Sequence, residues 1–257
     1  MSRIIAIANQ KGGVGKTTTA INLASCLAEA GKKVLTIDLD PQGNMTSGLG
    51  VNKNELENTV YELMLDECSI KESMVDTVVD GMKIIPSNVN LAGAEIELLG
   101  IEDKEYILKN AVDYVRDDYD FIIIDTPPTL GCMLSNALTF ADEVVIPVTC
   151  DRYGMEGISD LYVTIHATQK YTNRNLRVTG VLLNKYKEKT TLCREISEAL
   201  PSVLAMFETT VFETKVRECE DCKKAQSARM GVQAYNAKCT TAKDYWNVCE
   251  EIVRRRA

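Results

Sequence analysis

A short segment near the N-terminus combines glycines, two lysines and hydroxyl side chains, a combination suited to binding a phosphate chain. It contains Lys11, Gly12, Gly13, Val14, Gly15, Lys16, Thr17 and Thr18. Glycines allow successive backbone N–H groups to curl around a phosphate without Cβ clashes. Lys16 is placed to reach the β- and γ-phosphates, and the Thr17 hydroxyl to ligate Mg²⁺. We therefore expect a nucleotide-phosphate loop here. The alternative is a glycine-rich hairpin with incidental lysines.

Acidic side chains follow two apolar segments further along the chain. Asp38 and Asp40 lie at the end of the first segment, and Asp125 directly follows the second. The carboxyl ends of strands in an open parallel sheet face the ligand crevice. Carboxylates there can hold Mg²⁺ or position water, and phosphoryl transfer depends mainly on such positioned charge. For Asp38 and Asp40, the alternative is that they are solvated loop acids, and it weighs more for Asp38 than for Asp40.

Strands and helices alternate around these residues. Continuous apolar runs between helical patterns indicate a parallel sheet covered on both faces, so we expect a doubly wound, mostly parallel α/β fold of the P-loop NTPase type. Strands are predicted at residues 4–8, 34–39, 83–86, 121–124, 143–147, 178–183 and about 206–212. Helices are predicted at residues 17–30, 103–115, 157–170, 192–200 and 241–255, with helical surface connections at 43–82.

Composition narrows the class of protein. The 257 residues carry a formal net charge of −8, which argues against a surface that is basic overall but leaves room for a local basic patch. The nine cysteines are odd in number and scattered, unlike a disulfide framework. The sequence shows neither a secretory signal nor an apolar run of the roughly 20 residues that a membrane span requires. We expect a cytoplasmic protein with one domain over residues 1–257.

The phosphate loop and two further segments resemble the ParA/MinD group of deviant Walker A ATPases. The run from Lys11 to Thr17 matches the deviant motif Lys-Gly-Gly-x-Gly-Lys-Thr. Residues 34–44 look like the second motif of the family, and residues 121–128 look like its Walker B strand. The resemblance covers nearly the whole chain and is strongest to the small ParA/Soj proteins of chromosome and plasmid partition.

This resemblance implies a role for each matching residue. Lys11 is the signature lysine that crosses an ATP-sandwich dimer to the phosphates of the partner, and Gly12 lies at that tight interface. Lys16 binds the phosphates of its own site, and Asp40 activates water. Asp125 acts on Mg²⁺ through water, as does Asp40. Asn184 matches an adenine-contacting position. ATP and Mg²⁺ are the implied cofactors.

The resemblance also implies non-specific DNA binding by the ATP-bound dimer. Lys189 matches a DNA-contacting arginine of Soj-like proteins, and Arg217 is a second basic candidate. A phosphate contact tolerates lysine because it needs positive charge rather than a bidentate fork. The alternative is that these are ordinary solvated side chains. The segment after Thr214 departs from the family pattern, which weakens the alignment around Arg217.

That departing segment also holds a CxxC pair, Cys219 and Cys222. Such a pair can be redox-active or can form half of a zinc site. Because no second Cys/His pair at a plausible spacing follows, we expect two unrelated thiols.

Three functions compete. The leading one is a DNA-partition ATPase that is stimulated by a ParB-like, DNA-bound partner. The second is a MinD-like membrane-associated ATPase, which requires a C-terminal amphipathic helix with a basic face; the pair Glu250-Glu251 counts against binding to an anionic membrane. The third is a nucleotide-gated scaffold with negligible turnover, against which Lys11 and Asp40 argue.

Overall fold

The computed structural model describes residues 2–151, 156–188 and 190–255. A seven-stranded sheet runs through its centre, in the order β3-β4-β2-β5-β1-β6-β7. The strands are β1 (Arg3–Ile7), β2 (Val34–Asp38), β3 (Val75–Asp76), β4 (Met82–Ile85), β5 (Phe121–Asp125), β6 (Glu143–Thr149) and β7 (Arg177–Asn184). All neighbouring strands are parallel except β3, which pairs antiparallel with β4. The predicted α/β fold class is confirmed.

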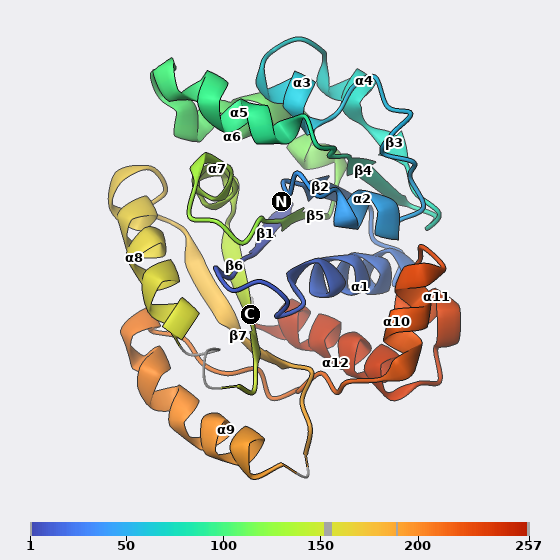
Figure 1. Ribbon diagram of the computed structural model, residues 1–257, viewed down its shortest axis with the longest axis vertical. Coiled ribbons are helices and arrows are strands. Elements are labelled where there is room, and N and C mark those ends of the chain that lie inside the picture. The colour runs from blue at the N-terminus through green and yellow to red at the C-terminus, as the bar shows by residue number, and fades with distance from the viewer. Residues whose placement is uncertain (1, 152–155, 189, 256–257) are drawn as a thin grey trace.

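Helices cover both faces of this sheet (Figure 1). One layer holds α1 (Lys16–Glu29), α2 (Asn44–Gly48), α10 (Glu220–Ser227), α11 (Val232–Asn236) and α12 (Thr240–Arg254). The other holds α3 (Val60–Met64), α5 (Leu91–Glu97), α6 (Ile107–Val112), α7 (Cys132–Phe140), α8 (Glu156–Tyr171) and α9 (Thr191–Leu204). The short α4 (Ile70–Ser73) follows α3.

The pleat of the strands divides the core between these two layers. In β1, Ile4 and Ala6 pack with the layer that contains α7, whereas Ile5 and Ile7 pack with α1 and α12. Because successive side chains of a strand point to opposite faces, a strand buried on both faces must be apolar throughout. This explains the continuous apolar runs in the sequence.

Two predicted elements differ in the structure. The strand expected at about 206–212 is wrong: a 3₁₀ turn occupies Ala205–Phe207, and only Val211 forms an isolated bridge, with Val181. The chain turns at Glu208, whose φ of 52° is incompatible with a strand.

The helix expected at 103–115 is broken into two 3₁₀ turns, Lys104–Tyr106 and Asp113–Asp118, on either side of α6. The Asn136 side chain accepts a hydrogen bond from the Leu108 N–H (3.0 Å) and donates one to the Lys104 carbonyl (2.9 Å). These bonds take the place of backbone bonds that a continuous helix would make. The antiparallel strand β3 within residues 43–82 was also not expected.

Candidate nucleotide site

The phosphate loop (residues 11–17) connects β1 to α1 at the carboxyl edge of the sheet, and its shape depends on glycine. Gly13 and Gly15 have φ values of 77° and 92°, in the left-handed region that other residues rarely adopt. A Cβ on Gly15 would lie 2.2 Å from the Nδ2 atom of Asn184. Asn184, at the end of β7, donates from that atom to the Val14 carbonyl (3.0 Å). Asn184 therefore supports the loop itself, beside the adenine contact that the resemblance implies.

Lys16 is the first residue of α1 and is only 7% exposed. Its Nζ atom donates to the Lys11 carbonyl at 3.3 Å, so the ammonium group lies under the loop. Burial lowers the pKa of Lys16, and the charges of Asp125 and Asp40 oppose that shift. A lysine held between a glycine-rich loop and two carboxylates is placed to bind the phosphates of a metal-nucleotide complex.

The Lys11 side chain pairs with a residue outside the phosphate loop. Its Nζ forms an ion pair with Asp151, just beyond the end of β6, and the Thr149 hydroxyl donates to the other Asp151 oxygen at 2.6 Å. The side chains of Lys11 and Asp151 remain 25% and 41% exposed. Sequence reasoning did not anticipate Asp151, because no motif connects it to the loop and the two residues lie far apart in the chain.

The two acids at the end of β2 have different roles: Asp38 is the last residue of the strand, and Asp40 follows it. Asp38 is fully buried and accepts hydrogen bonds from the Thr46 N–H (2.9 Å), the Thr46 hydroxyl (2.8 Å) and the Asp40 N–H (3.1 Å). Burial raises the pKa of Asp38 to about 6, against the opposing effect of these bonds. Asp40 is 9% exposed and accepts a bond from the Gln42 N–H at 2.9 Å. Both acids are thus buried, and the solvated-loop alternative is excluded for them; Asp38 holds the loop that positions Asp40.

Asp125 ends β5, between the ends of β1 and β2. Both of its carboxylate oxygens are buried and have no hydrogen-bond partner of normal geometry among the described residues. Burial and the neighbouring Asp38 raise its pKa well above the ordinary value, although the nearby Thr17 hydroxyl and Lys16 favour the charged form. A buried polar group of this kind is costly unless something pairs with it. Together with Thr17 and Asp40, Asp125 fits the oxygen donor set that Mg²⁺ takes, directly or through water.

Next to the loop, a cavity of about 160 Å³ lies between α1, the end of β7 and α10. Its lining includes Thr18, Asn184, Lys185, Arg217 and Tyr245. The Thr18 hydroxyl accepts a hydrogen bond from the Gln226 side chain of α10 (2.8 Å), and the Lys185 Nζ donates to the Gly13 carbonyl (2.8 Å). This cavity is the part of the site suited to a base; the contributions of Lys185 and Gln226 were not expected from the sequence.

The structure gives one of the two expected DNA-contact residues an internal partner. Arg217 donates from its Nε and Nη2 atoms to the Asp244 carboxylate, at 2.9 and 2.5 Å, and its own N–H binds the same group at 3.0 Å. The side chain of Asp244, on α12, is 5% exposed and that of Arg217 is 45% exposed. The guanidinium group therefore anchors this segment while part of it faces solvent. Lys189, the other candidate, lies outside the described residues.

The cysteines of the CxxC pair also have an additional neighbour. The Cys219 thiol is hydrogen-bonded to Cys239, which caps the start of α12. The sequence predicted two unrelated thiols because no second Cys/His pair follows them. Cys239 is a single cysteine that only the fold places beside Cys219, so sequence spacing could not indicate it.

The comparisons with known proteins agree with this geometry. A family model described as "AAA domain" matches residues 2–178. The sporulation initiation inhibitor protein Soj of Bacillus subtilis is 42% identical over 252 residues, which cover 98% of both chains. The chromosome partitioning protein ParA of Caulobacter vibrioides is 36% identical over 98% of this chain and 94% of its own. The chain belongs to the ParA/Soj family of partitioning ATPases.

Solved structures of relatives contain the ligands for which this site is suited. A cobyrinic acid a,c-diamide synthase from Mycobacterium smegmatis, 34% identical, has a TM-score of 0.86 and was solved with ADP and magnesium; the match covers 99% of this chain and 95% of that one. A putative plasmid partition protein from Borrelia burgdorferi, solved with AMPPNP, is 29% identical with a TM-score of 0.77 over 100% and 98% of the two chains. The ParA/Soj chain thus shares a nucleotide-binding architecture with solved proteins that carry different functional names.

Proposed function

We propose that this ParA/Soj chain is a Mg²⁺-dependent ATP hydrolase that works as a nucleotide-timed dimer. The observation that carries the proposal is the meeting of Lys16, Asp40 and Asp125 at the mouth of one glycine-rich loop. The charges of Asp125 and Asp40 act on the pKa of Lys16, and those of Lys16 and Asp40 act on the pKa of Asp125, so the three groups share one small, poorly solvated space. Positioned charge in such a space is what phosphoryl transfer requires.

Each residue has a defined task in this proposal. The N–H groups of residues 12–15, with those of Thr17 and Thr18, bind the phosphates together with Lys16. Thr17 holds Mg²⁺ through its hydroxyl, and Asp125 and Asp40 hold it through water. Asp40 also orients the attacking water, since its carboxylate accepts a hydrogen bond from the Gln42 N–H and its own N–H donates to Asp38. Bound Mg²⁺ supplies charge neutralisation of the β- and γ-phosphates.

Lys11 acts on the other subunit. In the isolated chain its ammonium group pairs with Asp151, so reaching the phosphates of a partner requires this pair to separate. A partly exposed ion pair of this kind contributes only about 0–1 kcal/mol, so a sandwich dimer can replace it. Gly12 supports the same arrangement: in the part of the chain that the structure describes, no heavy atom beyond its chain neighbours lies within 4 Å of the position its Cβ would take, so a second chain could approach there.

The switch is proposed to act on DNA, together with a ParB-like DNA-bound partner, in the cytoplasm and on the nucleoid. The names of the relatives, chromosome partitioning proteins and Soj, support this target. Lys189 and Arg217 remain the proposed DNA contacts. They would concentrate positive charge on one face of a dimer whose chains each carry a net charge of −8, so binding should depend steeply on salt.

The membrane alternative finds no support in the described residues. The apolar side of α12 is occupied inside the protein: Tyr245, Val248 and Ile252 are buried in the core shared with α1. Glu251 is also buried and pairs with Arg255. Among the described helices, none has the length and hydrophobicity to cross a bilayer.

The decisive experiment compares the wild type with Asp40→Ala by size-exclusion chromatography and light scattering, with Mg²⁺ and ATP. The variant should bind ATP without hydrolysing it and accumulate as a dimer that binds DNA, with an affinity that falls as salt rises. The same preparation with ADP should be monomeric. A variant that stays monomeric with ATP, or that hydrolyses it at the wild-type rate, would refute the proposed roles of the dimer and of Asp40.

A further inference from the structure

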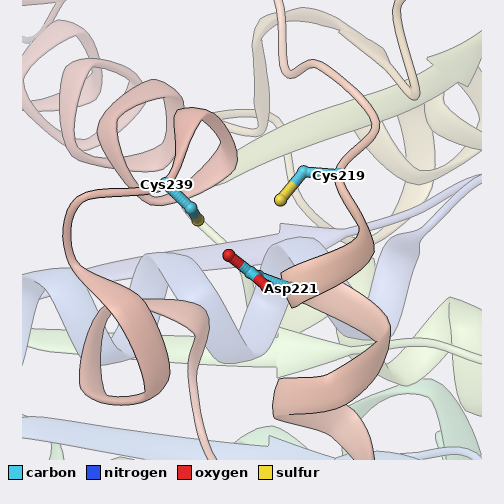
Figure 2. Close-up of side chains that lie close together, drawn as sticks. All are labelled: Cys219, Asp221 and Cys239. Carbon is cyan, nitrogen blue, oxygen red and sulfur yellow. The ribbon is translucent and has the colours of Figure 1, made fainter.

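Three side chains of the kind that bind metal ions meet on the surface beside the proposed base cavity. They are Cys219, Asp221 and Cys239, and one ligand atom from each lies within 4.8 Å of the other two. Figure 2 shows the two sulfur atoms and the carboxylate converging from different parts of the chain. All three residues are half-buried.

The fold holds each of these groups in place. Cys219 occupies the N-cap position of α10, Asp221 lies in the first turn of that helix, and the Cys239 thiol caps α12 by accepting from the Ala242 N–H. The Asn236 side chain donates a hydrogen bond to the Asp221 carboxylate at 2.8 Å. A polar neighbour that fixes a carboxylate in this way is the arrangement found around metal-binding carboxylates.

The donor set matches zinc better than other common ions. Zn²⁺ takes thiolate, imidazole and carboxylate ligands in tetrahedral geometry, whereas Mg²⁺ and Ca²⁺ prefer oxygen alone.

We propose that Cys219, Asp221 and Cys239 bind one zinc-class divalent cation, which fastens the start of α10 to the start of α12. Cys239 is separated in sequence from Cys219 and Asp221 by the rest of α10 and by α11, so the cation would close the loop that runs from one helix start to the other. No part of this binding step depends on nucleotide.

The site has a direct structural connection to the phosphate loop. Cys219 and Cys222 line the same cavity as Thr18, Asn184 and Tyr245. Gln226, on α10, donates to the Thr18 hydroxyl. A cation that fixes α10 would therefore fix one wall of this cavity. Resting on the proposed function, we infer that the cation raises nucleotide affinity by ordering that wall in advance, a coupling that must act equally in both directions.

The test begins with zinc uptake by the reduced, full-length protein, followed by desalting and elemental analysis. The wild type should retain one zinc per chain. Cys219→Ser and Cys239→Ser should each lose it, and both should fold, because serine is itself a favoured N-cap residue. Asn236→Ala should weaken zinc binding by about 10- to 100-fold, as expected when a group that orients a ligand is removed.

A matched control is available in a second pair of thiols. Cys150 and Cys193 are also hydrogen-bonded to each other, but among the described residues they belong to no three-ligand group. Cys193→Ser should keep full zinc stoichiometry. If the reduced wild type retains no zinc, if Cys193→Ser loses the zinc, or if Cys239→Ser keeps it, the proposed site is wrong. Formation of a Cys219–Cys239 disulfide by a chain that takes up no zinc would equally overturn the proposed site.

The coupling is measured by titrating a fluorescent ATP analogue with Mg²⁺, with and without zinc. Zinc should tighten binding between about 5- and 150-fold, the usual range for coupled sites, in the wild type but not in Cys239→Ser. If the wild type binds the analogue equally tightly with and without zinc, the proposed coupling is wrong. Lys16→Ala separates the two proposals: it should lose nucleotide binding yet still bind zinc, so a failure of the nucleotide site leaves the zinc measurement intact.

Discussion

The two ends of the candidate nucleotide site are built in different ways. At the phosphate end, one continuous segment provides the loop and its lysines, and strand ends deliver Asp40 and Asp125 against it. At the base end, the cavity takes residues from α1, from the end of β7, from the segment around Arg217 and from α12. The first end is local in sequence, and the second exists only once the chain has folded.

The two ends should also tolerate substitution differently. The phosphate end holds buried carboxylates of like charge, and burial raises the pKa of both Asp38 and Asp125. Without its ligand, this end is therefore strained. The base end is held by satisfied pairs such as Arg217 with Asp244. Substitutions at the first should therefore change chemistry, and substitutions at the second should change stability and affinity.

The largest expected effect is that of Lys11→Ala on turnover. If Lys11 acts on the partner's phosphates as an arginine finger does, its loss should lower kcat by about 10³-fold. The affinity of the monomer for ATP should stay within a few-fold of wild type, whereas Lys16→Ala should abolish it. Steady-state hydrolysis and equilibrium nucleotide titration measure the two quantities.

A mixing experiment then tests whether Lys11 acts in trans. Lys11→Ala and Asp40→Ala should each be inactive, but a mixture should recover part of the activity. In a mixed dimer, the site with an intact Asp40 receives its lysine from the other chain. A mixture as inactive as its components would assign Lys11 to its own site and remove the shared catalysis from the proposal.

A pair of glycine variants separates loop shape from dimer contact. Gly15→Ala should destabilise the chain by about 1–3 kcal/mol, the cost of a residue held in an unfavourable conformation, because its φ is 92° and its Cβ meets Asn184. Gly12→Ala has open space and should leave stability within about 0.5 kcal/mol of wild type, while weakening the ATP-bound dimer. Urea unfolding and size-exclusion chromatography give the two readouts. Equal losses of stability would mean that the two glycines have the same role.

Arg217→Ala tests whether the base end is indeed structural. Removal of the guanidinium group takes two of the three Arg217 hydrogen bonds from the nearly buried Asp244 carboxylate and leaves the bond from the residue 217 N–H. The cost should be about 1–3 kcal/mol, below the roughly 3–5 kcal/mol of a fully buried pair, because Arg217 is 45% exposed. Arg217→Lys, which keeps the charge, should recover part of it. The second measurement is DNA binding at a series of salt concentrations. If the slope of log affinity against log salt concentration falls by about 1, Arg217 contacts a phosphate in addition to its structural role. An unchanged slope would remove Arg217 from the DNA surface.

The sequence predicted the phosphate end because the physics of that end is local. Glycine spacing, Lys16 and the apolar strands before Asp40 and Asp125 each carry their signal within a few residues, and the sheet order then brings them together. The ion pair of Lys11 with Asp151, the support of the loop by Asn184 and the approach of Cys239 to Cys219 carry no such signal. They depend on which strands become neighbours and on where α12 packs, and single-sequence periodicity does not encode either.

The smallest expected effect concerns the charge of Asp125. Its pKa in the folded chain lies above the ordinary value of about 3.9, so the folded state binds this proton more tightly than the unfolded state. The resulting stabilisation is fully present below pH of about 4 and is lost as the pH rises through the folded-state pKa. Asp125→Asn should therefore stabilise the nucleotide-free chain by about 1–2 kcal/mol at pH 8, a gain typical of removing strain at an active site. At pH 5 this gain in stability should be smaller. The Asp125→Asn variant should also lose Mg²⁺-dependent nucleotide binding.

Asp76→Asn, at a carboxylate that is 83% exposed, is the control for urea unfolding at both pH values. A gain at Asp125 that does not change with pH would show that the buried charge is not what strains the phosphate end.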